Sequence, residues 1–175
     1  RDSRFSGYGN RSELIELIVD SVKKSEPFIY AYWDGVDRIA HEFGFTDRYF
    51  TELEECDLMV TELLRRLPSN VALIVTSDHG QVEVGDRMIE LTDDLNDLLS
   101  KQSGEARFRW LHALDGSEQD LLQIAKETFE DVAWIMSKKE IIDEGWLGPL
   151  VDRTVEARLG DVALVAREKI GFTDP

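Results

Sequence analysis

The fold of this chain is decided by residues 71–80, which read VALIVTSDHG. A short, largely apolar run such as 71–76, bounded by turn-forming residues 68–70, is typical of a strand that is covered on both faces. Asp78 and His79 follow at its carboxyl end. Ligand-binding groups in open α/β sheets lie beyond this end of a strand. The stretch therefore predicts a buried strand that presents a carboxylate and an imidazole side by side.

A second stretch repeats this pattern earlier in the chain. Residues 28–33 read FIYAYW, a β-rich run that predicts a second buried strand. Asp37 and His41 follow it, four residues apart. This spacing places both side chains on one face of a helical turn, and both groups can bind a divalent metal ion.

The segment between the two runs predicts how they are arranged. Apolar residues recur at three- and four-residue steps from about residue 46 to 67, which indicates one long helix. Two strands separated by a helix favour a parallel pair with a right-handed crossover. In that arrangement both Asp/His elements emerge at the same edge of the sheet, as a two-metal site requires.

Each motif also has an interpretation without function. An Asp-His pair after a strand can form a turn and cap the next helix. An Asp and a His four residues apart can form a solvated surface pair. Two strand-then-Asp/His units in one chain of 175 residues favour the metal site over both alternatives.

The two motifs resemble those of the type I phosphodiesterase/nucleotide pyrophosphatase family in the alkaline phosphatase superfamily. Members carry Asp-x-x-Gly-His after one strand and Ser/Ala-Asp-His-Gly after a later one. The corresponding stretches here are residues 37–41, with Ala40 in place of the usual glycine, and residues 77–80. A looser likeness extends to residues 144–149 and 158–162. The resemblance implies that Asp37 and His41 bind one zinc ion and that Asp78 and His79 bind the other.

The resemblance also implies a fold. We expect an α/β chain with an alkaline-phosphatase-like, mostly parallel sheet flanked by helices, forming part of a domain with a small α+β insert. Residues 1–10 are expected to be a linker or cut end, and residues 11–100 the α/β part that carries the metal motifs. Residues 101–158 are expected to form the small subdomain, and residues 159–175 a returning core strand and a truncated end.

The implied activity is zinc-dependent hydrolysis of phosphoesters through a Thr or Ser phospho-enzyme. No segment before Asp37 looks like a strand that ends in such a nucleophile and a further metal-binding Asp, and no histidine follows Asp161. We therefore expect a C-terminal fragment that lacks the nucleophile and is inactive alone. Its two zinc ions, or other divalent ions, are expected to bind weakly or not at all, because two protein ligands per ion fall short of the usual three or four.

Other functions stay open at this point. A sulfatase, phosphonate hydrolase or phosphomutase of the same superfamily would use similar metal ligands, and the missing nucleophile would distinguish them. A non-catalytic binding domain on the same scaffold is a further alternative. The presence of a ligand residue at all four matching positions argues against that alternative.

Composition limits the partners. A formal net charge of −16 argues against a nucleic acid polymer as a ligand, because like charges repel. A small phosphoester or nucleotide remains compatible, since local metal charge can outweigh a distant acidic surface. The sequence has no apolar run of membrane-spanning length, and we expect a cytoplasmic location. The oligomeric state cannot be predicted.

Three further residues could have a chemical role. His112 lies in an alternating segment, residues 107–113, that predicts a half-buried strand, and there it is either a ligand or, as we favour, a hydrogen-bonded histidine. Cys56, the one cysteine, falls on the apolar face of the predicted long helix and is expected to be an inert thiol. Asp34 is either a hydrogen-bond acceptor for His41 or, as we favour, part of an acidic surface turn.

Overall fold

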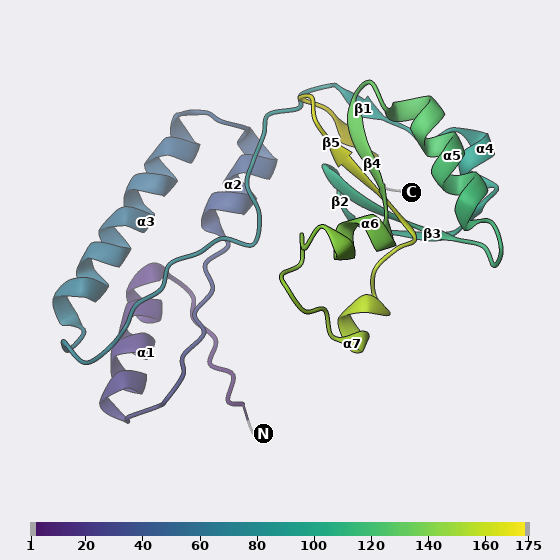
Figure 1. The fold of residues 1–175 in the computed structure, drawn as a ribbon. Coiled ribbons are helices and arrows are strands. Elements are labelled where there is room, and N and C mark those ends of the chain that lie inside the picture. The colour runs from purple at the N-terminus through teal and green to yellow at the C-terminus, as the bar shows by residue number, and fades with distance from the viewer. Residues whose placement is uncertain (1–2, 174–175) are drawn as a thin grey trace. The chain divides into compact units, whose positions relative to one another are not determined.

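The computed structural model describes residues 3–173 (Figure 1). The chain divides into two compact units, of which the first ends at Gln81 and the second begins at Val82. Each unit has its own apolar core. The domain boundaries predicted from the sequence stay predictions.

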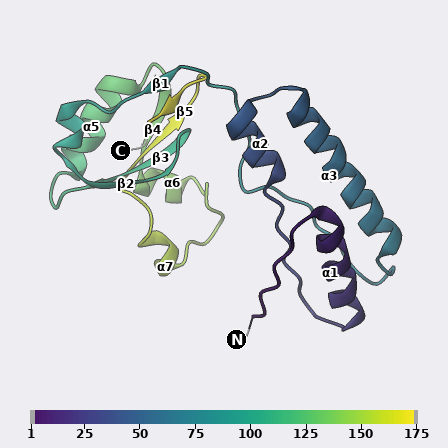
Figure 2. The same cartoon turned by 180° about the vertical axis from the view of Figure 1, so that it is seen from behind.

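The first unit contains three helices, α1 (Arg11–Lys23), α2 (Gly35–Phe43) and α3 (Asp47–Arg66). In both views α1 lies along the C-terminal half of α3, and α2 lies beside its N-terminal half (Figures 1 and 2). The extent of α3 confirms the long helix predicted from the apolar periodicity.

An apolar cluster joins α1 to α3. Four residues of α1 form its buried stripe and pack against Leu63 of α3, and partly buried residues of α3 and of other segments of the unit complete the cluster. The stripe is Leu14, Ile15, Ile18 and Val19, and the partly buried residues are Tyr8, Trp33, Met59, Leu67 and Leu73. Trp33 and Leu73 matter for function because each lies in a segment that leads into one of the Asp/His motifs.

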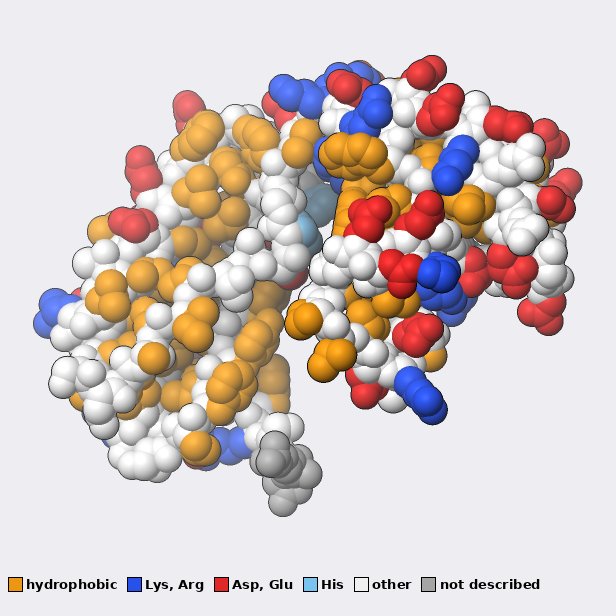
Figure 3. Space-filling view, in the orientation of Figure 1, with side chains coloured by type: hydrophobic (Ala, Val, Ile, Leu, Met, Phe, Trp, Pro, Cys, Tyr) orange, Lys and Arg blue, Asp and Glu red, His pale blue; other side chains and the backbone are white. Residues whose placement is uncertain are grey.

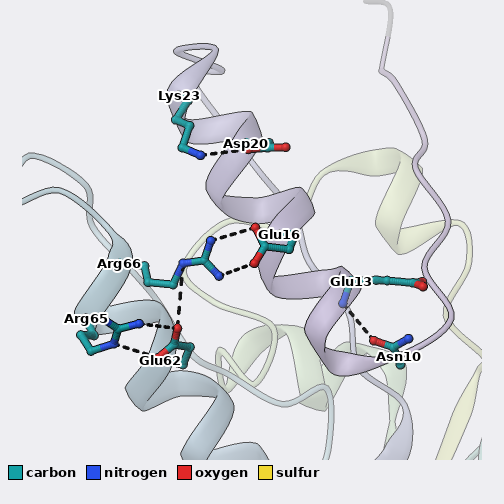
Figure 4. Close-up of polar contacts among 8 residues, drawn as sticks. All are labelled: Asn10, Glu13, Glu16, Asp20, Lys23, Glu62, Arg65 and Arg66. Carbon is teal, nitrogen blue, oxygen red and sulfur yellow. Dashed lines mark hydrogen bonds and ion pairs between the residues drawn. The ribbon is translucent and has the colours of Figure 1, made fainter.

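Polar contacts add to this packing at the helix ends and on the surface (Figure 4). Asn10 caps α1 by accepting a hydrogen bond from the Glu13 amide at 3.0 Å. Arg66 of α3 donates to both carboxylate oxygens of Glu16 in α1, at 2.6 and 2.8 Å. Exposed ion pairs contribute little to stability, because solvent screens the two charges. The apolar cluster is therefore the main link between the two helices.

The prediction of two buried strands in this unit is wrong. Segments 28–33 and 71–76 are extended, but within residues 3–173 neither takes part in a strand ladder, so the predicted parallel pair is absent from the described structure. Trp33 and Leu73 face the helices, whereas Phe28 and Ile74 are 81% and 84% exposed. A strand needs a hydrogen-bonded neighbour, and a buried strand needs cover on both faces. Among the described residues, only one face of each of these two segments is covered by other side chains.

The second unit is built on a four-stranded antiparallel sheet with the order β2-β3-β5-β4. Its strands are β2 (Leu99–Glu105), β3 (Phe108–Ala113), β4 (Ala133–Ser137) and β5 (Val162–Ala166), and the short strands β1 (Met88–Ile89) and β6 (Gly171–Phe172) form a parallel pair. The helices are α4 (Asp93–Asn96), α5 (Glu118–Phe129), α6 (Lys138–Asp143) and α7 (Arg153–Glu156). Helix α5 packs on β4 and β5. Ser137 opens α6 with the two reciprocal hydrogen bonds of a capping box.

The core of the second unit lies between this sheet and α5. Side chains that alternate along the strands, one stripe of α5, and residues of α4 and β6 form this core. Its largest fully buried members are Phe172, Leu95, Leu111, Leu121 and Leu164. The expected mixed α/β class is confirmed. None of the described helices is long and apolar enough to cross a lipid bilayer.

His112 has the surroundings that the sequence favours, whereas Cys56 is only half-buried and lies beside the Glu52 carboxylate. Ser103 Oγ and His112 Nε2 share a hydrogen bond of 2.8 Å across β2 and β3, so His112 is a hydrogen-bonded strand residue. Burial and the positive charge of Lys101 lower the pKa of His112. Burial, followed by the charge of Glu52, raises the pKa of the Cys56 thiol, which disfavours its reactive thiolate form.

The apolar cluster of the first unit can be tested by comparing two neighbouring leucines. Leu63 is 4% exposed within the cluster, whereas Leu64 is 64% exposed on the same helix. Leu63→Ala should lower the free energy of unfolding by about 2–5 kcal/mol, because it removes buried contacts and leaves a cavity. Leu64→Ala should change it by less than about 0.5 kcal/mol. Urea denaturation followed by circular dichroism measures both values, and equal losses would contradict the described packing.

The environment of His112 predicts a pH effect. A lowered pKa means that the folded state binds fewer protons than the unfolded state, so the stability from this group is complete above the ordinary pKa and is lost as pH falls. Lys101→Gln removes the repelling charge opposite His112 and should raise the pKa of His112. An NMR titration of the imidazole measures this pKa. Lys139→Gln serves as the control, because Lys139 is paired with Asp143. This variant should leave the pKa of His112 unchanged.

Candidate functional site

The first motif lies on α2, as its spacing predicts. Asp37 is in the first turn and His41 in the last. Because the two residues are one helical turn apart, their side chains lie on one face, with Asp37 Oδ1 and His41 Nε2 separated by 3.5 Å. Asp34 accepts a weak hydrogen bond from Arg38 Nε at 3.4 Å. This contact agrees with the surface-turn interpretation of Asp34.

The second motif lies in a turn that follows the extended segment 71–76. Asp78 Oδ1 accepts a hydrogen bond from the His79 amide at 3.2 Å, which orients the carboxylate. His79 Nδ1 lies 3.0 Å from the carbonyl oxygen of Gly80. A carbonyl oxygen only accepts hydrogen bonds, so this contact assigns the proton to Nδ1. In the neutral ring Nε2 then carries the lone pair, as a metal-binding histidine requires.

The two motifs meet at Asp37. His79 Nε2 lies 3.8 Å from Asp37 Oδ1 and 3.8 Å from Asp78 Oδ1. Asp37 Oδ1 is therefore near one histidine from its own helix and one from the second motif. The two motifs thus lie close to each other, although residues 3–173 do not form the strand ladder expected to bring them together.

Gln81 is a member of this group that the sequence does not predict. Its side-chain Nε2 donates a hydrogen bond of 3.0 Å to Asp37 Oδ1. The only available signal is its position directly after Gly80, and a lone glutamine there has no spacing pattern to mark it. The contact joins the second motif to the first by a hydrogen bond as well as by the histidine.

The electrostatic field at this place is negative. Partial desolvation, followed by the charges of Asp78, Asp37 and Asp34, raises the pKa of Tyr32. Tyr32 belongs to the extended segment before α2, and its carbonyl oxygen accepts a hydrogen bond from the Tyr8 hydroxyl. The carboxylates that disfavour a phenolate here would attract a cation in the same place.

The carboxylates and imidazoles of the two motifs are chemically suited to bind a divalent metal ion. The distances within pairs of these groups are also compatible with binding one ion. Carboxylate oxygen and imidazole nitrogen are common zinc ligands, and two ligands of a tetrahedral zinc ion lie about 3.3 Å apart. The 3.5 Å between Asp37 Oδ1 and His41 Nε2 is close to this value. Across residues 3–173, however, no three His, Cys, Asp or Glu side chains converge closely enough to hold an ion. The described residues thus supply pairs of ligands rather than a complete site.

Comparison with protein-family models identifies one family. The model described as type I phosphodiesterase / nucleotide pyrophosphatase matches residues 5–174. A search of curated proteins finds no match. The matched region includes both Asp/His motifs and most of both units. The chain therefore belongs to the type I phosphodiesterase/nucleotide pyrophosphatase family.

Proposed function

We propose that this chain is part of a zinc-dependent phosphodiesterase or nucleotide pyrophosphatase, in which Asp37 and His41 bind one metal ion and Asp78 and His79 the other. Family membership supports hydrolysis of small phosphoesters, in a family that is generally metal-dependent. The choice of zinc and the assignment of the four ligands are our own. The expected cytoplasmic location remains a prediction.

The observation that carries this proposal is the position of Asp37 Oδ1. It lies 3.5 Å from His41 Nε2 and 3.8 Å from His79 Nε2. These three side chains come from two motifs, so their proximity does not follow from the spacing within either one. If His79 Nε2 carries a lone pair, it faces the oxygens of Asp37 and Asp78. A cation between these atoms would be attracted by the two carboxylates and by the lone pair.

In the proposed site each residue has a defined task. Asp37 and Asp78 supply negative charge, and the helix and the turn that carry them determine where their oxygens lie. The contact of His79 Nδ1 with Gly80 holds the ring so that Nε2 faces the two carboxylates. Gln81 holds Asp37 Oδ1 in place. Bound metal ions would neutralise phosphate oxygens and lower the pKa of a metal-bound nucleophile.

The proposed reaction also needs a group that attacks phosphorus. We assign none of the residues of this chain to that role, and we propose that a Thr or Ser outside residues 1–175 forms the phospho-enzyme. This assignment distinguishes the proposal from a sulfatase, which would use a modifiable cysteine. The 175-residue chain alone should accordingly bind metal weakly and turn over little or no substrate.

Metal binding by the chain itself can be tested first. Isothermal titration with zinc should give weaker binding for Asp37→Asn than for the wild-type chain, by at least about tenfold, because an amide is a poorer ligand than a carboxylate. Asp57→Asn removes an exposed acid of α3 and is the matched control. Equal affinity in all three proteins would show that Asp37 is not a ligand.

Catalysis requires the intact protein. We expect it to hydrolyse bis(p-nitrophenyl) phosphate in the presence of zinc and to lose activity when a chelator removes the metal. His79→Gln should lower kcat/KM by about a hundredfold or more, because the metal supplies several kcal/mol of transition-state stabilisation. Asp57→Asn should leave kcat/KM unchanged. An intact protein that binds zinc but cleaves no phosphodiester would favour a non-catalytic binding domain.

A further inference from the structure

Glu52 is a buried carboxylate with no part in the metal chemistry proposed above. Its side chain is 8% exposed, whereas that of Glu55, one turn further along α3, is 48% exposed. Burying a charge is costly unless partners compensate it. The identity of the partners of Glu52 therefore indicates what the buried charge does.

The partners of Glu52 come from three segments of the first unit. Arg11, at the start of α1, forms an ion pair with Glu52 Oε2 through Nη2. Trp33 Nε1 donates a hydrogen bond of 2.7 Å to Glu52 Oε1. Cys56 Sγ lies 3.8 Å from the same oxygen. One carboxylate thus joins α1, α3 and the segment that leads into α2.

The same carboxylate also packs against the backbone where α2 begins. Gly35 is buried and is the first residue of α2. A Cβ atom added at Gly35 would collide with Glu52 Oε1 and Trp33 Nε1. The start of the helix therefore lies directly on the Glu52–Trp33 hydrogen bond, two residues before Asp37.

We infer that Glu52 is a positioning residue that holds α2, and with it Asp37 and His41, in place for metal binding. Glu52 acts through Trp33 and Gly35 rather than by touching the metal ligands. Its effect on metal binding rests on the proposed function, whereas its effect on α2 does not. The two effects can be measured separately.

The test compares Glu52→Gln with Glu55→Gln in the 175-residue chain. Both variants remove a carboxylate that faces Arg11, but only Glu52 contacts Trp33 and Gly35. Hydrogen exchange measured by mass spectrometry should show about tenfold faster exchange of residues 36–44 in Glu52→Gln, because a buried charge-assisted contact is lost. Exchange within α1 should stay within about twofold. Zinc affinity should fall about tenfold in the same variant and remain unchanged in Glu55→Gln.

The possible outcomes separate this inference from the proposed function. Unchanged exchange in α2 of Glu52→Gln, equal effects in Glu55→Gln, or faster exchange across all three helices would overturn the positioning role. If neither the wild-type chain nor the intact protein binds zinc, the proposed function fails. The exchange data then still decide the role of Glu52. Trp33→Phe removes the indole donor but leaves the carboxylate, and should also accelerate exchange in α2. It provides a second test should Glu52→Gln fail to fold.

Discussion

Packing of Trp33 and Leu73 against one apolar cluster is the constraint on which the candidate site depends. Each residue lies a few positions before an Asp/His motif, and both contact the layer formed by α1 and α3. Two segments attached to the same layer bring their following residues close together without a hydrogen-bonded ladder. The cluster around Leu63 thus explains how Asp37 and His79 meet.

Polar contacts then refine this arrangement. Glu52 fixes the start of α2 through Trp33, Gln81 holds Asp37, and Gly80 orients His79. These hydrogen bonds fix the orientation of side chains that apolar packing alone would leave free to rotate. The result is a negative field at one place on the first unit, although both charge signs occur elsewhere on the surface (Figure 3). A chain of net charge −16 would need such a local cation site to bind an anionic phosphoester.

Local features of the fold could be predicted from the sequence, and features that depend on distant partners could not. The helix over residues 47–66 follows from apolar periodicity, and the shared face of Asp37 and His41 follows from helical geometry. Segments 28–33 and 71–76 have the composition of buried strands, yet a ladder depends on neighbours that composition cannot reveal. Gln81 and Glu52 were missed because neither belongs to a spacing pattern. Glu52 is one of several acids on α3, and only its burial distinguishes it.

The central claim is that both Asp/His motifs bind metal at one place. Nitrogen-15 NMR of the histidine side chains during zinc titration tests this claim directly, because His112 provides an internal control in the second unit. We predict that Nε2 of His41 and Nε2 of His79 shift over the same range of zinc concentration while both nitrogens of His112 remain unchanged. A zinc-induced shift confined to His112, or no shift at His41 and His79 at saturating zinc, would contradict the account.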